Sequence, residues 1–469
     1  MPCPLAVDVT HRASHRGTHL VRAATRSATC SGRPEVASWV WFDTLAFYRG
    51  VMPASHRAVT RRRLALCALG ALAVSACSEA SQTGPDVTLA VATSTTAAPR
   101  AADGTLRIAT VMPMTGSGAR LGVPLATAVA SAIEEINLGG GVLGRTVDLV
   151  QFDEVTTADL TQVRDADVDA VIGPASSLIA LSTLSELVST PMLACSPTAT
   201  AITLDDAPDQ NLVFRTVGSD SAQMSALART ASRTGNVQAV VAHLDDPYGR
   251  DLADEFSVQL VRRGTVTVVD RVDFAADDPD LSDEAARILA ENPGVVAVLA
   301  DGDDGGRMIA ALDAAIGSAE VVPTIVVNDG LRTATEVMAQ LQPTTRDAII
   351  GVAARSIVPG IDQPGGHFAT NAHDCAMLIA LSAVQAGTDD PRAIAARLPS
   401  VSTGGRVCTQ FTECRDAIAA GLQIDYNGLS GNVELSATTG DLQRAWFVEF
   451  TFGDDGREVV VAPTGVEIS

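Results

Sequence analysis

Three short loops rich in hydroxyl residues each follow an apolar run and precede a helix-like run. They span residues 114–118 (MTGSG), 173–177 (GPASS) and 196–200 (SPTAT). A hydroxyl at a helix N-terminus caps the helix and leaves backbone N–H groups free to bind an anion. Capping alone explains any one of these loops, but three at consecutive strand ends favour a shared carboxylate site. Its candidate residues are Thr115, Ser117, Ser176, Ser177, Thr198 and Thr200.

The first of these loops is close to a dinucleotide-binding fingerprint. Gly116, Gly118 and Gly122 are spaced G-x-G-x-x-x-G, one residue longer than that motif. The chain contains no lysine, which excludes both a Walker A phosphate site and a pyridoxal Schiff base. We therefore interpret the loop as one wall of a cleft for a small ligand, with Leu121 beside it.

Acidic residues follow the strand-like runs of the second half of the chain. Asp301, Asp303 and Asp304 follow VVAVLA, and Asp329 follows PTIVVN. A carboxylate at a strand end can pair with an ammonium group, whereas Asp303 and Asp304 are expected to be solvated surface. Anion donors in one half and a carboxylate in the other would suit a zwitterion such as an amino acid.

The sequence argues against catalysis and against nucleic acid. It has no G-x-S-x-G elbow and no H-E-x-x-H, and only three of its histidines lie beyond residue 104. The net charge is −22, with no basic run richer than Arg61–Arg63. We expect a protein that is not an enzyme and that needs no metal and no other cofactor.

Strand-like and helix-like runs alternate from Thr105 onward, which predicts parallel sheets covered on both faces. The run LATAVASAIEEIN places Leu125, Val129, Ile133 and Ile136 on one helical face. The polar segment 211–223 reads as a crossover. The expected fold class is α/β, with two Rossmann-like lobes joined by a hinge and the ligand beyond the carboxyl ends of the strands.

These runs suggest the following organisation. Residues 105–218 form lobe 1 and 219–351 form lobe 2; 352–435 return to lobe 1 and 436–469 return to lobe 2. The preceding parts are a flexible tether over 77–104, a lipoprotein signal peptide over 52–76, and over 1–51 an extension that precedes the true translation start.

The signal peptide is inferred from a charge pattern. Arg61–Arg63 precede the apolar run LALCALGALAVSA and then Cys77, too short a run to span a bilayer stably. The end of this run resembles the lipobox of bacterial lipoproteins, in which the cysteine is lipidated. The alternative is an ordinary signal peptide with a chance cysteine.

The four cysteines beyond residue 104 fall into two groups. Cys408 and Cys414 are close together in a loop-like stretch, which predicts a local disulfide in an exported protein. Cys195 and Cys375 each lie in apolar runs, so we expect core packing; whether they interact is left open.

Several stretches resemble type I periplasmic binding proteins of the leucine/isoleucine/valine-binding family. These are the opening IATVMPMTGSGARLGVPLATAVASAIEEINLGGGVLGRTVDLVQFDE, then VIGPASS, CSPTAT and DDPYGRDLADEF. The similarity covers roughly residues 105–465. The C-terminal part, with GLQIDYNGLSGNVEL and two cysteines, is similar to the variety found in high-GC Gram-positive bacteria.

The resemblance implies roles for particular residues. Ser177 would hold a ligand carboxylate, and Thr198 and Thr200 would add carboxylate and ammonium contacts. Asp329 would meet the α-ammonium, and Tyr248 would be an aromatic at the cleft edge. Two departures put branched-chain ligands in doubt: Leu121 and Gly302 stand where relatives can carry larger aromatics.

The resemblance also implies a function. Such proteins capture a small solute between two lobes by hinge closure and deliver it to ABC permease subunits. We expect an extracytoplasmic lipoprotein, anchored to the cytoplasmic membrane through Cys77, that binds an amino acid, an amide or a similar solute. The alternative is a ligand-sensing surface domain of the same fold that reports to a signalling partner.

Overall fold

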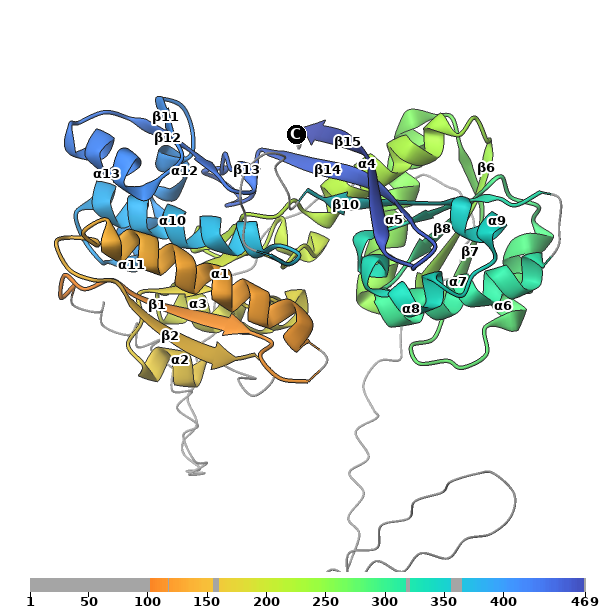
Figure 1. Ribbon diagram of the computed structural model, residues 1–469, viewed down its shortest axis with the longest axis horizontal. Helices are drawn as coiled ribbons and strands as arrows, with labels where there is room; N and C mark the ends of the chain where they lie inside the picture. The colour runs from red at the N-terminus through yellow and green to blue at the C-terminus, as the bar shows by residue number, and fades with distance from the viewer. Residues whose placement is uncertain (1–101, 117, 155–159, 318–320, 356–364, 468–469) are drawn as a thin grey trace, which may run out of the picture. The chain divides into compact units, whose positions relative to one another are not determined.

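The computed structural model describes residues 102–116, 118–154, 160–317, 321–355 and 365–467, with side chains to 461 in the last strand (Figure 1). The expected extension, signal peptide and most of the tether lie outside the described residues. So do Cys77 and Ser117.

The first sheet has five parallel strands in the order β2-β1-β3-β4-β5. The strands are β1 (Arg107–Met112), β2 (Asp148–Asp153), β3 (Ala170–Ile172), β4 (Leu193–Ser196) and β5 (Val213–Arg215). The connecting helices are α1 (Ala119–Leu138), α2 (Thr161–Asp165), α3 (Ser177–Ser189) and η1 (Ile202–Leu204).

The second sheet has seven strands in the order β15-β14-β10-β9-β8-β6-β7. The strands are β6 (Gln238–Leu244), β7 (Thr267–Phe274), β8 (Val295–Leu299), β9 (Thr324–Val327), β10 (Ile349–Ala354), β14 (Arg444–Phe452) and β15 (Glu458–Glu467). Its helices are α4 (Asp220–Arg233), α5 (Pro247–Arg263), α6 (Ser282–Ala290), α7 (Gly302–Ile316), η2 (Asp329–Thr333), α8 (Thr335–Met338) and α9 (Pro343–Asp347).

Between β10 and β14 the chain returns to the first sheet. The returning helices are α10 (Ala369–Ala386), α11 (Pro391–Ala395), α12 (Leu398–Val401) and α13 (Phe411–Ala419). A small third sheet joins β11 (Arg406–Cys408), β12 (Ile424–Gly428) and β13 (Gly431–Asn432). The sequence pattern did not predict this sheet, because its strands are too short to show a period.

Both large sheets are buried on two faces, because successive residues of a strand point to opposite sides. In β6, Val240 and Ala242 belong to one core and Ala239 and Val241 to another. In β1, Ile108 faces the core of α1 and α10, whereas Ala109 faces the core around Val163 and Leu187. Strands of this kind read as near-continuous apolar runs.

The apolar face predicted for helix α1 from its residue spacing is the face that the structure buries. Its predicted face of Leu125, Val129, Ile133 and Ile136 is buried in the first core, which also holds α10. Among the described helices, α1 is the one whose length and mean hydropathy would allow it to cross a membrane. Its buried face packs in the core, as in a soluble-domain helix.

The predicted α/β class is confirmed, and three expectations need correction. The second sheet is mixed, because β14 runs antiparallel to β10 and β15 antiparallel to β14. The segment 211–223 contains β5 and the start of α4 and is not a simple crossover. Asp304, in the first turn of α7, is not solvated surface: it is 7% exposed, and its carboxylate accepts hydrogen bonds from Arg307 and the Asp277 N–H.

The structure contains two disulfides. The predicted Cys408–Cys414 bond is confirmed. The expectation that Cys195 and Cys375 only pack in the core was incomplete, because they are bonded to each other. Cys195 lies in β4 and Cys375 in α10, and a sequence separation of 180 residues hides their proximity.

Candidate functional site

Two of the predicted hydroxyl loops are bonded to each other where β3 and β4 end. The Ser177 Oγ accepts the Ala201 N–H at 3.2 Å, and the Thr198 Oγ1 donates to the Ala175 carbonyl at 2.8 Å. Gly173 begins the loop 173–177 with φ +112°, and a Cβ there would lie 2.3 Å from the Val111 oxygen. Only glycine fits this turn, which leads directly into Ser176 and Ser177.

The start of α3 presents hydrogen-bond donors. Ser176 is the N-cap, and its Oγ accepts the Ile179 N–H. Ser177 follows as the first helical residue, so the helix supplies no acceptor for its backbone N–H. Its hydroxyl hydrogen is also free to donate, because its bond to Ala201 uses only a lone pair. These groups lie at the positive end of a helix, which favours an anion.

Glu154 lies beneath this helix start and was missed from the sequence. Its Oε1 accepts the Ser176 N–H at 2.7 Å, and the side chain is 3% exposed. Burial raises the pKa of Glu154 to about 7, against the hydrogen bonds from Ser176 and Ala175, which lower it. The one feature of the sequence that could have indicated Glu154 is its position directly after β2.

A second residue missed from the sequence is Asp220, the first residue of α4. Its backbone N–H donates to the Thr200 carbonyl at 2.8 Å, and its side chain is 1% exposed. Neither carboxylate oxygen has a hydrogen-bond partner of ordinary length among the described residues. A buried carboxylate is costly unless it is hydrogen-bonded, and the nearby hydroxyls of Thr200 and Tyr248 lower its pKa only in part.

Thr200, Asp220, Tyr248 and Asp329 together form what we call the acidic cluster. Burial raises the pKa of Asp220 to about 7, and the charge of Asp329 adds to this, whereas Thr200, Arg215 and Tyr248 lower it. Burial also raises the pKa of Tyr248 well above its ordinary value, together with the charges of Asp220 and Asp329. The cluster therefore joins two carboxylates, a phenol and a threonine hydroxyl.

These four residues come from different strand ends. Thr200 follows β4, Tyr248 lies in the first turn of α5 after β6, and Asp329 begins η2 after β9. Asp220 follows β5. The carboxyl ends of parallel strands are where α/β proteins place their ligands, and two adjacent carboxylates at such a place suit a cation.

Other predicted residues make contacts with residues outside the acidic cluster. The Thr115 Oγ1 is exposed and donates to Asp153 at 2.6 Å. Leu121 is half-buried against the core of α1 and α10. Gly302 packs so closely that a Cβ would lie 1.9 Å from the Thr333 Oγ1. The glycine at this position is therefore required by the contact between α7 and η2.

The glycines of the opening loop also have a packing role. A Cβ at Gly122 would lie 2.1 Å from the Pro113 oxygen, and one at Gly118 would lie 2.8 Å from the Pro113 side chain. Helix α1 can thus start directly against the end of β1. This close approach explains the near-match to a dinucleotide fingerprint.

Phe368 is a further side chain that the sequence did not indicate. It precedes α10 with φ +60°, and it packs against both the core of α1 and α10 and the core of α4 and α5. Tyr248 packs against the second of these cores. The neighbouring His367 feels the charge of Asp329, although burial and Arg332 dominate in lowering its pKa. Phe368 thus packs between the two cores, next in the chain to a residue that feels the charge of Asp329.

Three of the cavities among the described residues have volumes of about 600, 500 and 900 Å³, and none of these three is lined by a member of the acidic cluster. The first lies near Arg392 and Pro399, the second near Asp280 and Arg307, and the third near Glu135 and His373. The acidic cluster is marked instead by its chemistry, because it brings the buried carboxylate of Asp220 close to a second carboxylate.

The fold and the strand-end site define a class of protein, the two-lobed solute-binding proteins. A family model described as periplasmic binding protein matches residues 105–448. A chemotactic signal transduction system substrate-binding protein, BasB of Halobacterium salinarum, is 30% identical over 362 residues, which is 70% of this chain and 83% of that protein. The chain belongs to the periplasmic binding protein family, and the predicted resemblance to its leucine/isoleucine/valine-binding members is confirmed.

Two further similarities support this assignment. The Leu/Ile/Val-binding protein BraC3 of Rhizobium johnstonii is 29% identical over 232 residues, which is 48% of this chain and 62% of that protein. The branched-chain amino acid transporter substrate-binding protein LivJ of Streptococcus pneumoniae, solved in complex with isoleucine, has the same fold. It matches with a TM-score of 0.59 at 20% identity, covering 78% of this chain and all of that one.

Proposed function

We propose that this protein binds an amino acid or a related small polar solute that carries both a carboxylate and an ammonium group. The observation that carries the proposal is the acidic cluster, where the unpartnered carboxylate of Asp220 lies beside Asp329. Ser177 is linked to the same loop by its bond to Ala201. An anion site and a cation site therefore stand at opposite sides of Thr200.

The carboxylate of the solute binds at the start of α3. Ser177 donates its hydroxyl and its backbone N–H, and the helix dipole adds a favourable field. Ser176 and Thr198 shape this end, since their own polar groups are used in Glu154, Ile179 and Ala175 contacts. Thr115, Ser117 and Leu121 border the solute on the side of the first loop.

The ammonium group binds in the acidic cluster. Asp220 and Asp329 supply charge, Thr200 supplies a hydroxyl, and the face of Tyr248 adds a cation–π contact. Phe368 and Leu121 form the apolar wall for the rest of the solute. Gly302 has no side chain to contact the solute, because it packs closely against Thr333.

The biological role that we infer is that of the solute-binding lipoprotein of an ABC importer. Family membership supports an extracytoplasmic location and hinge closure on the solute. The lipid anchor at Cys77, the partner permease subunits and the absence of turnover belong to this proposal. So do the lobe boundaries 105–218, 219–351, 352–435 and 436–469.

A sensing role is the second candidate, because the Halobacterium relative is named as a chemotactic signal transduction protein. Both roles need the same solute site and differ only in the partner that recognises the loaded protein. Uptake of labelled solute in a deletion strain separates them. Transport predicts lost uptake, whereas sensing predicts normal uptake and a lost behavioural response.

The site assignment predicts that Ser177→Ala and Asp329→Asn each weaken solute binding by at least tenfold, because each removes a contact to a charged group of the solute. Calorimetry should follow a thermal-shift screen of amino acids, amides and small organic acids. A matched series of the amino acid, its amine and its acid tests the two ends separately.

Control variants are available at exposed positions away from the proposed contacts. Ser182→Ala lies on the exposed side of α3, and Asp347→Asn lies at the exposed end of α9. Both should bind normally. Unchanged affinity in Ser177→Ala and Asp329→Asn would overturn the site assignment, and equal binding of the amine and the amino acid would overturn the carboxylate end.

The lipoprotein assignment predicts that Cys77→Ala moves the protein from the membrane fraction to the medium, because the lipidated side chain is lost. Fractionation followed by immunoblotting measures this change. Cys67→Ala, within the same apolar run, is the control and should leave the protein membrane-bound. Continued membrane association of Cys77→Ala would contradict the anchor.

A further inference from the structure

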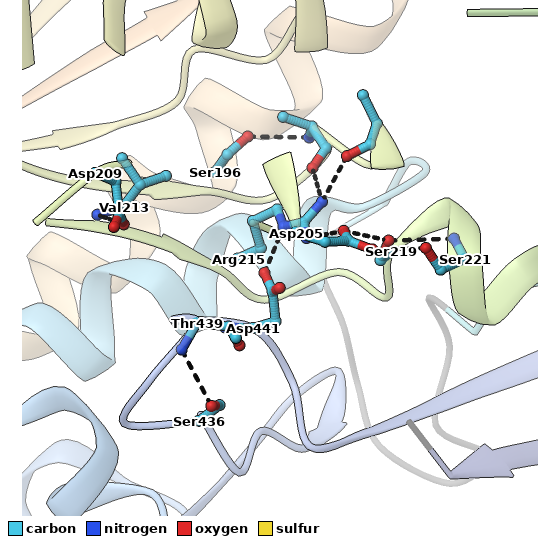
Figure 2. A network of polar contacts seen from close by, with 12 residues as sticks. Ser196, Asp205, Asp209, Val213, Arg215, Ser219, Ser221, Ser436, Thr439 and Asp441 are labelled. Carbon is cyan, nitrogen blue, oxygen red and sulfur yellow. Dashed lines mark hydrogen bonds and ion pairs between the residues drawn. The ribbon is translucent and has the colours of Figure 1, made fainter. Parts of the chain in front are cut away.

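Arg215 ends β5 and is 1% exposed, yet its guanidinium makes four polar contacts (Figure 2). Its Nε donates to the Asp441 Oδ1 at 2.6 Å, and its Nη2 donates to the Asp205 Oδ1 at 2.6 Å. Its Nη1 reaches the carbonyls of Ala199 at 3.4 Å and Ala201 at 3.2 Å. These two carbonyls flank Thr200, so Arg215 holds the backbone on both sides of that residue.

Asp205 extends this hydrogen-bond network to the residues that flank Asp220. Its Oδ1 accepts the Ser219 hydroxyl and its Oδ2 accepts the Ser221 hydroxyl, each at 2.6 Å (Figure 2). Asp220 itself donates its backbone N–H to the Thr200 carbonyl. One buried network therefore fixes both neighbours of Thr200 and both neighbours of Asp220.

The same network joins two of the segments that connect the sheets. Arg215 precedes the passage from β5 to α4, and Asp441 precedes β14. The Arg215 N–H also donates to the Gly440 carbonyl at 3.1 Å. The position of Asp220 is thus set at a junction of connecting segments.

The charges of this network act on Asp220 without touching it. The Arg215 guanidinium lowers the pKa of Asp220, against burial and Asp329, which raise it. Arg215 stays charged because Asp441 and Asp205 raise its pKa, although burial opposes its charge. Its influence on Asp220 is therefore electrostatic, through a fixed separation.

We propose that Arg215, with Asp205 and Asp441, is a positioning residue that holds Thr200 and Asp220 as one unit and supplies a positive charge that favours the ionised form of Asp220 for a cationic solute group. This inference rests on the proposed function. It adds a residue that contacts no solute yet sets both the geometry and the protonation state of one that does.

The test follows the titration of the Asp220 carboxyl by carbon NMR in the ligand-free protein, with Asp220→Asn used to assign the signal. Arg215→Gln removes the positive charge, so the Asp220 midpoint should rise by one pH unit or more. Asp441→Asn keeps an acceptor for the Arg215 Nε but removes a negative charge, so the midpoint should fall. A purely structural role predicts no such pair of opposite shifts.

Glu449→Gln is the control matched to Asp441→Asn. Both carboxylates are 9% exposed, and Glu449 is bound to a different arginine, Arg233, away from the site. It should leave the Asp220 midpoint in place. Where the solute is known, its affinity for Arg215→Gln should fall at least tenfold at pH 7 and recover partly at pH 9.

The outcomes distinguish this inference from the proposed function. An unchanged Asp220 midpoint in both Arg215→Gln and Asp441→Asn overturns the inference, even if solute binding is confirmed. If Arg215→Gln does not fold, the fall of the midpoint in Asp441→Asn alone decides. Opposite shifts support the inference even if no screened amino acid binds, since the titration needs no ligand.

Discussion

Asp220→Asn is expected to abolish solute binding and, at pH 8, to make the ligand-free protein more stable. The wild-type carboxylate is buried, and neither oxygen has a hydrogen-bond partner of ordinary length in the described part of the chain. Above its pKa it is an unpaired buried charge that lies beside Asp329, which is costly. Asparagine removes this charge, but it also removes the group that pairs with an ammonium, so affinity should fall at least a hundredfold.

The stability gain should depend on pH in a defined direction. The pKa of Asp220 is about 7 in the folded protein, against the model-compound value of 3.8. Between these values the folded state holds a proton that the unfolded state has lost, so the contribution of Asp220 to the free energy of unfolding falls as the pH rises from about 4 to about 7. Its full size is roughly 4 kcal/mol, at 1.36 kcal/mol per pH unit.

Urea unfolding of the two proteins at pH 4 and pH 8 measures this effect. The difference between Asp220→Asn and wild type should be small at pH 4 and large at pH 8. Asp206→Asn, at an exposed neighbouring position, should change neither stability nor binding. Because Glu154 also has a pKa of about 7, the comparison should be repeated in a Glu154→Gln background.

A stability difference that does not change with pH would contradict the assignment of Asp220 as a buried, unpaired carboxylate. Retained binding would contradict its role at the ammonium end. These two outcomes are independent, because the first concerns the ligand-free fold and the second concerns the solute. Loss of binding together with lower stability at both pH values would indicate a merely structural role.

Removal of the Cys195–Cys375 disulfide is expected to destabilise the protein far more than removal of Cys408–Cys414. The first bond closes a loop with a sequence separation of 180 residues, and the second one of 6 residues. Loop-closure entropy in the unfolded chain predicts a loss of about 5 kcal/mol for the first and about 2 kcal/mol for the second. Double cysteine-to-alanine variants unfolded in urea measure both.

The first disulfide also bears on the site. Cys195 is in β4, one residue before Ser196, whose hydroxyl accepts the Ala199 N–H at 3.0 Å and so shapes the loop to Thr200. Solute affinity should therefore fall in Cys195→Ala/Cys375→Ala and stay unchanged in Cys408→Ala/Cys414→Ala. Equal destabilisation of the two variants would contradict the loop-length argument.

Much of the fold was predictable, because it depends on short-range periodicity. Apolar runs separated by amphipathic helices predicted two parallel sheets, and the buried face of α1 followed from residues spaced three and four apart. The antiparallel strands β14 and β15 were missed. The pairing of β14 with β10 joins residues 93 to 99 positions apart in the chain, and no local pattern records such a partner.

The site was predictable only in part. Ser177, Thr200, Tyr248 and Asp329 were indicated by their positions after strands, together with the family resemblance. Asp220 was missed because only the fold shows that its carboxylate is buried. An aspartate at an exposed helix start would be an ordinary, favourable residue in a first turn.

The sequence by itself determined the class of protein, the strand-end positions of the ligand loops and the chemistry of the groups on them. These follow from residue types and local spacing, which the chain carries without reference to its fold. Only the tertiary structure decided which side chains meet: Asp220 with Asp329, Arg215 with Asp205 and Asp441, and Cys195 with Cys375. Burial and electrostatic coupling depend on distances between residues far apart in the chain, and those distances exist only once both sheets have formed.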